Sequence, residues 1–153
     1  MILRYSKINR PQVITPTRAN PSDAGLDVYY CPKEDFILGV ELEPGETSIF
    51  PTGLKFEVPH GYMLEVKNRS GNASKKSLLV GACVIDSGYS GEVFINLHNV
   101  GKEKQMIKRG MKIAQLVLVP VVPFQLIQSE ESELYQYPVT ISNRGDGALG
   151  STG

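Results

Sequence analysis

Short runs of alternating apolar and polar residues, each closed by a turn sequence, are the feature that most constrains the fold of this chain. The runs are GLKFEVP (53–59), GYMLEVKN (61–68) and GEVFINLHN (91–99). A period of two is typical of strands with one buried face. Turn sequences separate the runs: EPGE (43–46), PHG (59–61), DSGYSG (86–91) and VGKEK (100–104). Ten prolines and fifteen glycines among such short strands predict a β-sandwich or barrel in one domain.

Two further stretches complete the predicted fold. KIAQLVLVPVVPF (112–124) is apolar on both faces, which predicts a strand buried on both sides. Pro120 and Pro123 cannot donate to a sheet at those points, so we expect an edge strand or a crossing between sheets or subunits. SGNASKKSLL (70–79) is the one stretch that favours a helix, a short one with Ser70 as its N-cap.

The charge and cysteine content exclude several classes of protein. With 16 basic and 16 acidic residues the formal net charge is zero, which argues against a nucleic-acid binder held by a general positive field. A local group of Arg and Lys can still hold a small anion. Cys31 and Cys83 make no disulfide framework, and no Cys/His group indicates zinc. With no secretory signal and no apolar run of about 18 residues, we expect a soluble, intracellular protein without a membrane partner.

Two polar segments lie within or at the end of a predicted strand. In SDAGLDVYY (22–30), Asp27 falls inside a strand, where the ordinary reading is a solvent-facing carboxylate on an edge strand. In NRSGNASKK (68–76), Arg69, Ser70 and Gly71 offer a guanidinium, a hydroxyl and backbone amides to a phosphate group. A capped surface helix with a nearby arginine explains the same residues, and both readings stay open.

Two more segments break an apolar pattern. In VGACVIDSGYSGE (80–92), an apolar run leads to Asp86, where desolvation at the end of a buried strand would favour a general base. The plain alternative is a type I turn that starts at an aspartate, although Tyr89 is a large ring to place in a turn. Gln115 interrupts an apolar strand in KRGMKIAQLV (108–117), and a satisfied core hydrogen bond is the favoured explanation.

The sequence RGDGALGSTG (144–153) is rich in glycine and polar residues. It is nearly a phosphate-binding loop of the form G-x-x-x-x-G-K-[ST], with Ser151 in place of the lysine and no helix after it. We expect this segment to be mobile until something binds. Its RGD tripeptide resembles an adhesion signal, which requires an extracellular loop and is not favoured without an export signal.

In this order the five segments resemble the five motifs of the homotrimeric dUTP pyrophosphatases (dUTPases). SDAGLDV, NRSGNASKK, VGACVIDSGYSGE, KRGMKIAQLVLVP and RGDGALGSTG are similar to motifs one to five, so the resemblance covers residues 22 to 153. It implies an all-β, jelly-roll-like β-barrel or sandwich with one short helix and a flexible glycine-rich C-terminal tail. It also implies a β domain over 1–143 and a tail over 144–153 that closes a site on a neighbouring subunit of a homotrimer.

The resemblance implies hydrolysis of dUTP to dUMP and pyrophosphate, which limits uracil in DNA and supplies dUMP for dTMP synthesis. Asp86 is then the catalytic residue that activates the attacking water, and Tyr89 lies under the deoxyribose. Backbone groups from Cys83 to Ile85 would read the uracil edge. Asp27 would support the waters of a Mg²⁺ ion that enters with the triphosphate. The implied substrate-binding residues are Arg69, Ser70, Gly71, Cys83, Val84, Ile85, Tyr89, Phe94, Gln115, Arg144, Leu149, Gly150 and Ser151.

Two positions depart from the family pattern. The fifth motif usually reads R-G-x-G-G-F-G, and Leu149 stands here in place of the aromatic residue, after Ala148. Leucine can cover a base but cannot stack on it. The third motif usually has a glycine where this chain has Cys83, which is tolerable if only the backbone contacts the base. Both changes bear on catalytic strength rather than on the class of substrate.

Three alternatives remain beside dUTP hydrolysis. A dCTP deaminase on the same fold is disfavoured because this chain has no tryptophan and lacks the W-x-G turn of those enzymes. A non-catalytic dUTPase-like nucleotide-binding regulator, acting through a protein partner, is supported by the changed tail. A structural β-sandwich without a ligand is the third. The expected location is the cytoplasm, or the host cytoplasm or nucleus if a virus encodes the chain.

Overall fold

The computed structural model describes residues 1–136, which contain eleven strands, one α-helix and one turn of 3₁₀-helix. The strands are β1 (Arg4–Lys7), β2 (Gly25–Tyr29), β3 (Gly39–Leu42), β4 (Thr47–Pro51), β5 (Leu54–Glu57), β6 (Tyr62–Lys67), β7 (Leu78–Val80), β8 (Val84–Ile85), β9 (Phe94–Asn99), β10 (Gln105–Lys108) and β11 (Lys112–Pro120). The helices are α1 (Ser70–Lys76) and the 3₁₀ turn η1 (Glu131–Glu133).

The chain divides into two units, Met1–Val122 and Pro123–Gly153. All eleven strands and α1 belong to the first unit, and η1 belongs to the second. The predicted boundary between residues 143 and 144 lies outside the described residues, so it stays a prediction.

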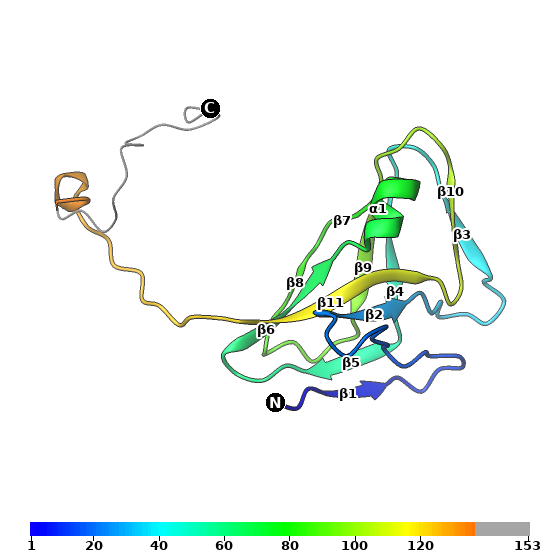
Figure 1. The fold of residues 1–153 in the computed structure, drawn as a ribbon, viewed down its shortest axis with the longest axis horizontal. Helices are drawn as coiled ribbons and strands as arrows, with labels where there is room; N and C mark the ends of the chain where they lie inside the picture. The colour runs from blue at the N-terminus through cyan, green and yellow to red at the C-terminus, as the bar shows by residue number, and fades with distance from the viewer. Residues whose placement is uncertain (137–153) are drawn as a thin grey trace. The chain divides into compact units, whose positions relative to one another are not determined.

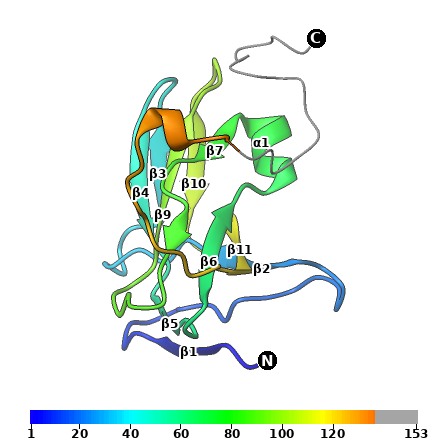
Figure 2. The ribbon, with the colours of Figure 1, turned by 90° about the vertical axis from the view of Figure 1, so that its left-hand side faces the viewer.

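The strands of the first unit form four antiparallel sheets (Figure 1). Their strand orders are β1-β5, β10-β3, β2-β11-β6-β8 and β4-β9-β7. Both ribbon views place the β1–β5 pair at one end of the unit and α1 near the other (Figures 1 and 2). The prediction of an all-β fold with one short helix is confirmed for residues 1–136, although these strands do not close into one barrel.

The alternation in the sequence sets the burial of each strand. In β5, Leu54 and Phe56 are buried, whereas the residues between and after them are exposed. Leu64 and Val66 of β6 and Ile95 and Leu97 of β9 are buried in the same way. The predicted strands are therefore confirmed, since each directs one face toward a shared core.

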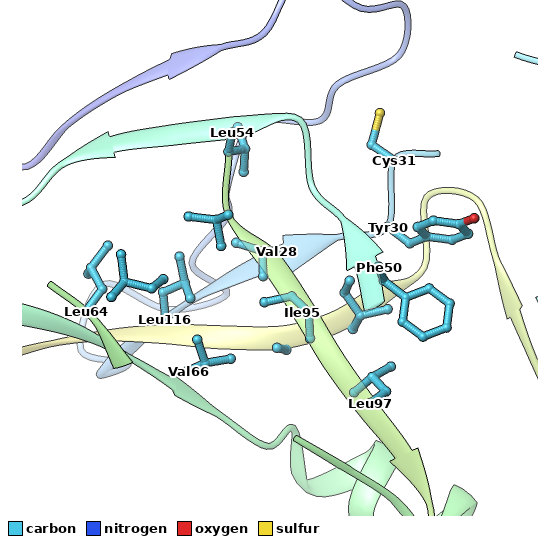
Figure 3. Close-up of a cluster of buried hydrophobic side chains, with 14 of the residues drawn as sticks. Val28, Tyr30, Cys31, Phe50, Leu54, Leu64, Val66, Ile95, Leu97 and Leu116 are labelled. Atoms are coloured by element: carbon cyan, nitrogen blue, oxygen red, sulfur yellow. The ribbon is translucent and has the colours of Figure 1, made fainter. Parts of the chain in front are cut away.

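That core lies between the larger sheets, with side chains from β2, β6 and β11 meeting those from β4 and β9 (Figure 3). Phe50 and Ile95 are almost fully buried within it. Tyr30 packs its ring edge-on against Phe50, with ring centroids 5.1 Å apart, an arrangement that aromatic pairs prefer. The core fixes the two sheets against each other, so polar groups at their ends have defined positions.

The structure corrects two predictions about β11. The strand lies between β2 and β6 rather than at an edge, and only Pro120, its last residue, is a proline within it. An end position needs no ladder donor, which is why a central strand tolerates this proline. The strand is not buried on both sides along its length within the chain: Ile113, Ala114 and Leu116 are buried, whereas Val117, Leu118 and Val119 are half-buried.

Helix α1 begins at Ser70, so the predicted role of Ser70 as N-cap is wrong. Arg69 has the extended backbone of the N-cap position, and no side chain caps the helix. The helix is held instead through Asn72, which is buried on the side that faces β11. Its amide donates to the carbonyl of Lys112 at 3.0 Å, where a bulge interrupts the pairing of β11 with β2.

Candidate active site

Four polar residues from the predicted motifs form one group, here called the β11 cluster: Asp27, Arg69, Lys112 and Gln115. Gln115 pairs with Asp27 of β2 on one side and with Lys67, the last residue of β6, on the other. Because β6 ends there, the chain turns into Asn68 and Arg69 directly beside that pair.

The carboxylate of Asp27 is the centre of the β11 cluster. Its Oδ1 accepts a hydrogen bond from Nε of Arg69 at 2.8 Å, and its Oδ2 lies 2.8 Å from Nζ of Lys112. The Asp27 side chain is 13% exposed, so the expectation of a plain solvent-facing carboxylate is wrong, although β2 is an edge strand of its sheet. The hydrogen bond to Asp27 raises the pKa of the Lys112 ammonium.

One carboxylate and two cations leave the β11 cluster with a local excess of positive charge. Arg69 uses Nε toward Asp27, and within the described residues its two terminal nitrogens make no hydrogen bond. A guanidinium held in this way presents its outer edge to a second anion. The cluster therefore has the chemistry of an anion site, despite the zero net charge of the whole chain.

Gln115 is half-buried, and its Nε2 donates to the carbonyl of Asn68 at 2.9 Å. The amide is satisfied as expected, but its hydrogen bond is exposed rather than in the core, and it ties β11 to the segment that carries Arg69. Gly25 gives the side chain its space, since a Cβ there would lie 3.0 Å from the Cβ of Gln115. Ser70 and Gly71 are exposed in the first turn of α1, next to Arg69.

A second group of predicted residues lines a pocket of about 190 Å³, here called the hairpin pocket. Its walls are Val84, Ile85, Asp86, Tyr89, Glu92, Val93 and Phe94. β8 pairs with β6 before the chain turns, and the N–H of Tyr89 donates to the carbonyl of Asp86 at 3.1 Å. The turn at Asp86 is thus present, and two carboxylates and two aromatic rings line one small volume.

The burial expected around Asp86 is not found within the single chain. Val84 and Asp86 are exposed, and only Ile85 between them is buried. A strand of two residues at the sheet edge is too short to enclose the side chain that follows it. Cys83 is exposed as well, and its carbonyl already accepts the N–H of Val66 at 2.8 Å.

Within residues 1–136, no hydrogen bond or ion pair joins the β11 cluster to the hairpin pocket. The structure therefore brings each set of predicted residues together but leaves the two sets as separate groups. Four predicted substrate-binding residues, Arg144, Leu149, Gly150 and Ser151, lie outside the described residues.

Sequence reasoning missed one member of each group, Lys112 and Glu92, and two residues that support them, Asn72 and Arg10. Lys112 and Asn72 stand inside segments that the motifs covered, where the polar character of each was the available signal. Glu92 lines the hairpin pocket and forms a buried ion pair with Arg10. No sequence signal links Arg10 and Glu92, which are 82 positions apart.

Potential metal ligands and helix lengths are both defined for the described part of the chain. Residues 1–136 hold no group of three His, Cys, Asp or Glu side chains close enough to share a metal ion. Both oxygens of Asp27 face cations, which does not fit direct ligation of Mg²⁺. No helix in these residues has the length and apolar character needed to cross a membrane.

Fold and site together define an all-β protein with a group of two cations and one carboxylate at one sheet end and a pocket lined by two carboxylates. The family is shown by comparison with known sequences: the model of the dUTPase family matches residues 12–153, so the chain belongs to the dUTPase family. The predicted family, and with it the predicted enzyme class of dUTP diphosphatase, is confirmed.

Curated relatives agree along nearly the whole chain. A deoxyuridine 5'-triphosphate nucleotidohydrolase of Bartonella henselae is 39% identical over 156 residues, covering 100% of this chain and 84% of its own. An enzyme of the same name from Chlamydia trachomatis is 35% identical over 140 residues, covering 90% of each chain.

Solved structures share the jelly-roll-like fold. A mutant dUTPase of phage 80alpha has a TM-score of 0.82 at 27% identity, covering 99% of this chain and 98% of its own. A mutant dUTPase from phage phi11 of S. aureus, described with a structural Mg(II) ion, has a TM-score of 0.75 at 27% identity, covering 86% of this chain and 98% of its own.

Proposed function

We propose that this protein hydrolyses dUTP to dUMP and pyrophosphate, and so limits uracil in DNA and supplies dUMP for dTMP synthesis. One observation carries the proposal: a chain that matches the dUTPase family over residues 12–153 lines a single pocket with Asp86, Tyr89 and Phe94. The pocket offers the groups that the reaction needs on the nucleoside side.

In this proposal, Asp86 orients a water molecule and accepts its proton as the water attacks the α-phosphorus, and pyrophosphate leaves. A positioned general base adds roughly 10²–10⁴-fold to a rate. Tyr89 lies under the deoxyribose, Phe94 borders the nucleoside, and backbone groups of Cys83, Val84 and Ile85 face the uracil. Support comes from solved mutants of the phage 80alpha dUTPase, which are altered at an aspartate and at a tyrosine three positions later. Asp86 and Tyr89 have the same spacing in this chain.

The β11 cluster is proposed to hold the triphosphate, with Ser70 and Gly71 of α1 beside it. Phosphoryl transfer depends mainly on positioning and on neutralising charge. Asp27 fits the task of fixing the cations, because it accepts from Arg69 and Lys112 at 2.8 Å each and leaves the outer edge of the guanidinium for phosphate oxygens. Gln115 supplies an amide at the same sheet end.

Mg²⁺ is proposed to enter with the triphosphate as part of the substrate. Such an ion keeps several of its waters and is bound largely through phosphate oxygens. Because two cations already face Asp27, its predicted role toward the ion is limited to contact through water.

We also propose a homotrimer with shared sites, in which the hairpin pocket of one subunit meets the β11 cluster of another and residues 144–153 of a third subunit close over both. The separation of the two groups within one chain supports this arrangement, as does a hollow of about 300 Å³ against β11, which five leucines and Arg18 help to line.

Shared sites can be tested by complementation. Asp86→Asn and Arg69→Ala each disable one group, so either pure protein should be inactive. Refolded as an equal mixture, they should recover about a quarter of the wild-type turnover, since that share of sites draws an intact group from each chain. A mixture as inactive as its components would show that each site is built from one chain.

The proposed reaction is tested by pyrophosphate release from dUTP, dCTP, dTTP and UTP with Mg²⁺. We expect release from dUTP, little from the others, and loss of turnover in Asp86→Asn. Asp35→Asn, at an exposed loop position, is the matched control and should behave as wild type. Equal turnover by Asp86→Asn would refute the assigned mechanism.

Pyrophosphate release, compared with the Kd for dUTP, separates the regulatory alternative. A protein that binds dUTP tightly but releases no pyrophosphate would be a nucleotide-binding regulator rather than an enzyme. Location in the cytoplasm, or in the host cytoplasm or nucleus for a virus-encoded chain, remains an expectation of the sequence.

A further inference from the structure

The ring of Tyr89 has open space on both sides. It lines the hairpin pocket, and it also lines a second pocket of about 430 Å³ together with residues of β1, β5 and the Ser87–Ser90 turn. The side chain is 44% exposed. Packing alone therefore does not fix the position of this ring.

One hydrogen bond and one glycine hold the ring instead. The hydroxyl of Tyr89 donates to the backbone carbonyl of Glu92 at 2.7 Å. Gly91 lets the ring fold back over the turn, because a Cβ at that position would lie 2.5 Å from the Tyr89 hydroxyl. The position of the ring thus depends on where the chain places Glu92.

Glu92 is itself held by a buried ion pair with Arg10. Their side chains are 11% and 8% exposed, and Oε1 of Glu92 accepts from both Nη2 of Arg10 and the N–H of Gly53, the latter at 2.8 Å. The carbonyl of the next residue, Val93, accepts from the buried hydroxyl of Thr52 at 2.7 Å. These contacts fix the return limb of the hairpin against the turn between β4 and β5.

Arg10 and Gly53 are joined by the backbone as well. The N–H of Ile8 donates to the carbonyl of Gly53 at 2.8 Å, so the segment that carries Arg10 is docked on the same turn. Gly53 has a φ of +72°, a backbone conformation that favours glycine. A Cβ at this position would also lie 2.5 Å from the side chain of Val13, so a larger residue does not fit. The ion pair therefore stands on a rigid base.

We infer that the Arg10–Glu92 pair is a positioning element of the active site, which sets the place of the Tyr89 ring and with it the rejection of a 2′-hydroxyl. The inference rests on the proposed function, in which Tyr89 lies under the deoxyribose. The pair touches no substrate; it acts through the carbonyl of Glu92. Loss of either partner leaves a buried charge alone, so the return limb must shift.

The test compares nucleotide selectivity in Arg10→Met, Glu92→Gln and Tyr89→Phe. Two measurements are made on each protein: kcat/KM for dUTP and for UTP, and Kd for the imido analogues dUpNHpp and UpNHpp. We expect the preference for the deoxynucleotide to fall on the order of 10-fold or more in each variant, since displacement by about 1 Å can cost 10²-fold. Lys104→Met, which removes an exposed pair with Glu41 and Glu43, should keep the wild-type preference.

Tyr89→Phe decides the case if the two charge variants do not fold, because it removes only an exposed hydrogen bond. Wild-type selectivity in folded Tyr89→Phe overturns the inference. So does a wild-type protein without preference for dUpNHpp over UpNHpp. If the wild-type protein binds dUpNHpp selectively but does not turn over dUTP, only the proposal of dUTP hydrolysis is refuted. The ratio of Kd for UpNHpp to Kd for dUpNHpp in each variant then still tests the positioning role.

Discussion

The substitution Asn72→Ala should loosen the helix that carries Ser70 and Gly71. Asn72 is 5% exposed, and its amide donates to the carbonyl of Lys112 at 3.0 Å and lies 3.5 Å from that of Ile113. The bulge between Lys112 and Ala114 interrupts the pairing of β11 with β2 at this point. The Asn72 amide thus takes the place of a β2 hydrogen-bond donor to β11 and anchors α1 to the sheet.

The magnitude follows from the lost partner. A buried carbonyl left without its donor costs about 1–3 kcal/mol. For a chain of this size each kcal/mol lowers Tm by about 2–4 °C, so we expect a fall of about 2–12 °C in Asn72→Ala. Because α1 holds Ser70 and Gly71 next to Arg69, KM for dUTP should rise while kcat changes less.

Differential scanning calorimetry and pyrophosphate release measure the two effects, at equal protein concentration because oligomers unfold in a concentration-dependent way. Ser74→Ala is the matched control: it lies on the same helix, is exposed, and loses only a bond to the carbonyl of Ser70. It should stay within about 0.5 kcal/mol of wild type. If both variants lower Tm equally, Asn72 is not the anchor.

Three further predictions follow from burial, steric space and the tail. Burial raises the pKa of the Cys31 thiol, so the stability that the buried neutral thiol contributes is complete below pH 9.0 and is lost as pH rises through the folded-state pKa. Cys31→Ala should therefore flatten the fall of Tm at alkaline pH. Cys83→Ala, at an exposed site, should leave that fall unchanged. Gly25→Ala should displace the Gln115 amide from the carbonyl of Asn68 and raise KM for dUTP several-fold. The substitution should also lower the free energy of unfolding by about 1–3 kcal/mol. An unchanged KM would count against Gln115 as a phosphate ligand. Deletion of 144–153 should leave a folded oligomer by light scattering but remove most dUTP turnover, and an unchanged kcat/KM would exclude a role for the tail in closing the site.

The elements that the sequence predicted well are those set by local pattern. Alternation marked β5, β6 and β9, because burial of every second side chain is a property of the strand itself. The turns at 43–46 and 59–61 were predictable for the same reason: Gly45 and Gly61 have φ values of +81° and +82°, which glycine adopts readily.

Sheet order could not be predicted from such patterns. Pro120 and Pro123 predicted either an edge strand or a crossing between sheets or subunits; the edge position is wrong, because β11 lies between β2 and β6 with Pro120 at its last position. A proline forbids only the hydrogen bond at its own residue, so its meaning depends on the register of the partner strands. Register is set by contacts between residues far apart in the chain.

The candidate site shows the same limit in its charges. Zero net charge carries no information on how charges are grouped: Arg69 and Lys112 come from separate segments and meet on one carboxylate, Asp27. A sequence motif identifies residues that can bind or react with a substrate. Which other residues hold those side chains in place depends on the fold. Since the effect of a charge depends on its distance from its partners and on its exposure, the electrostatics of this site follow from the register of β2 against β11 rather than from composition.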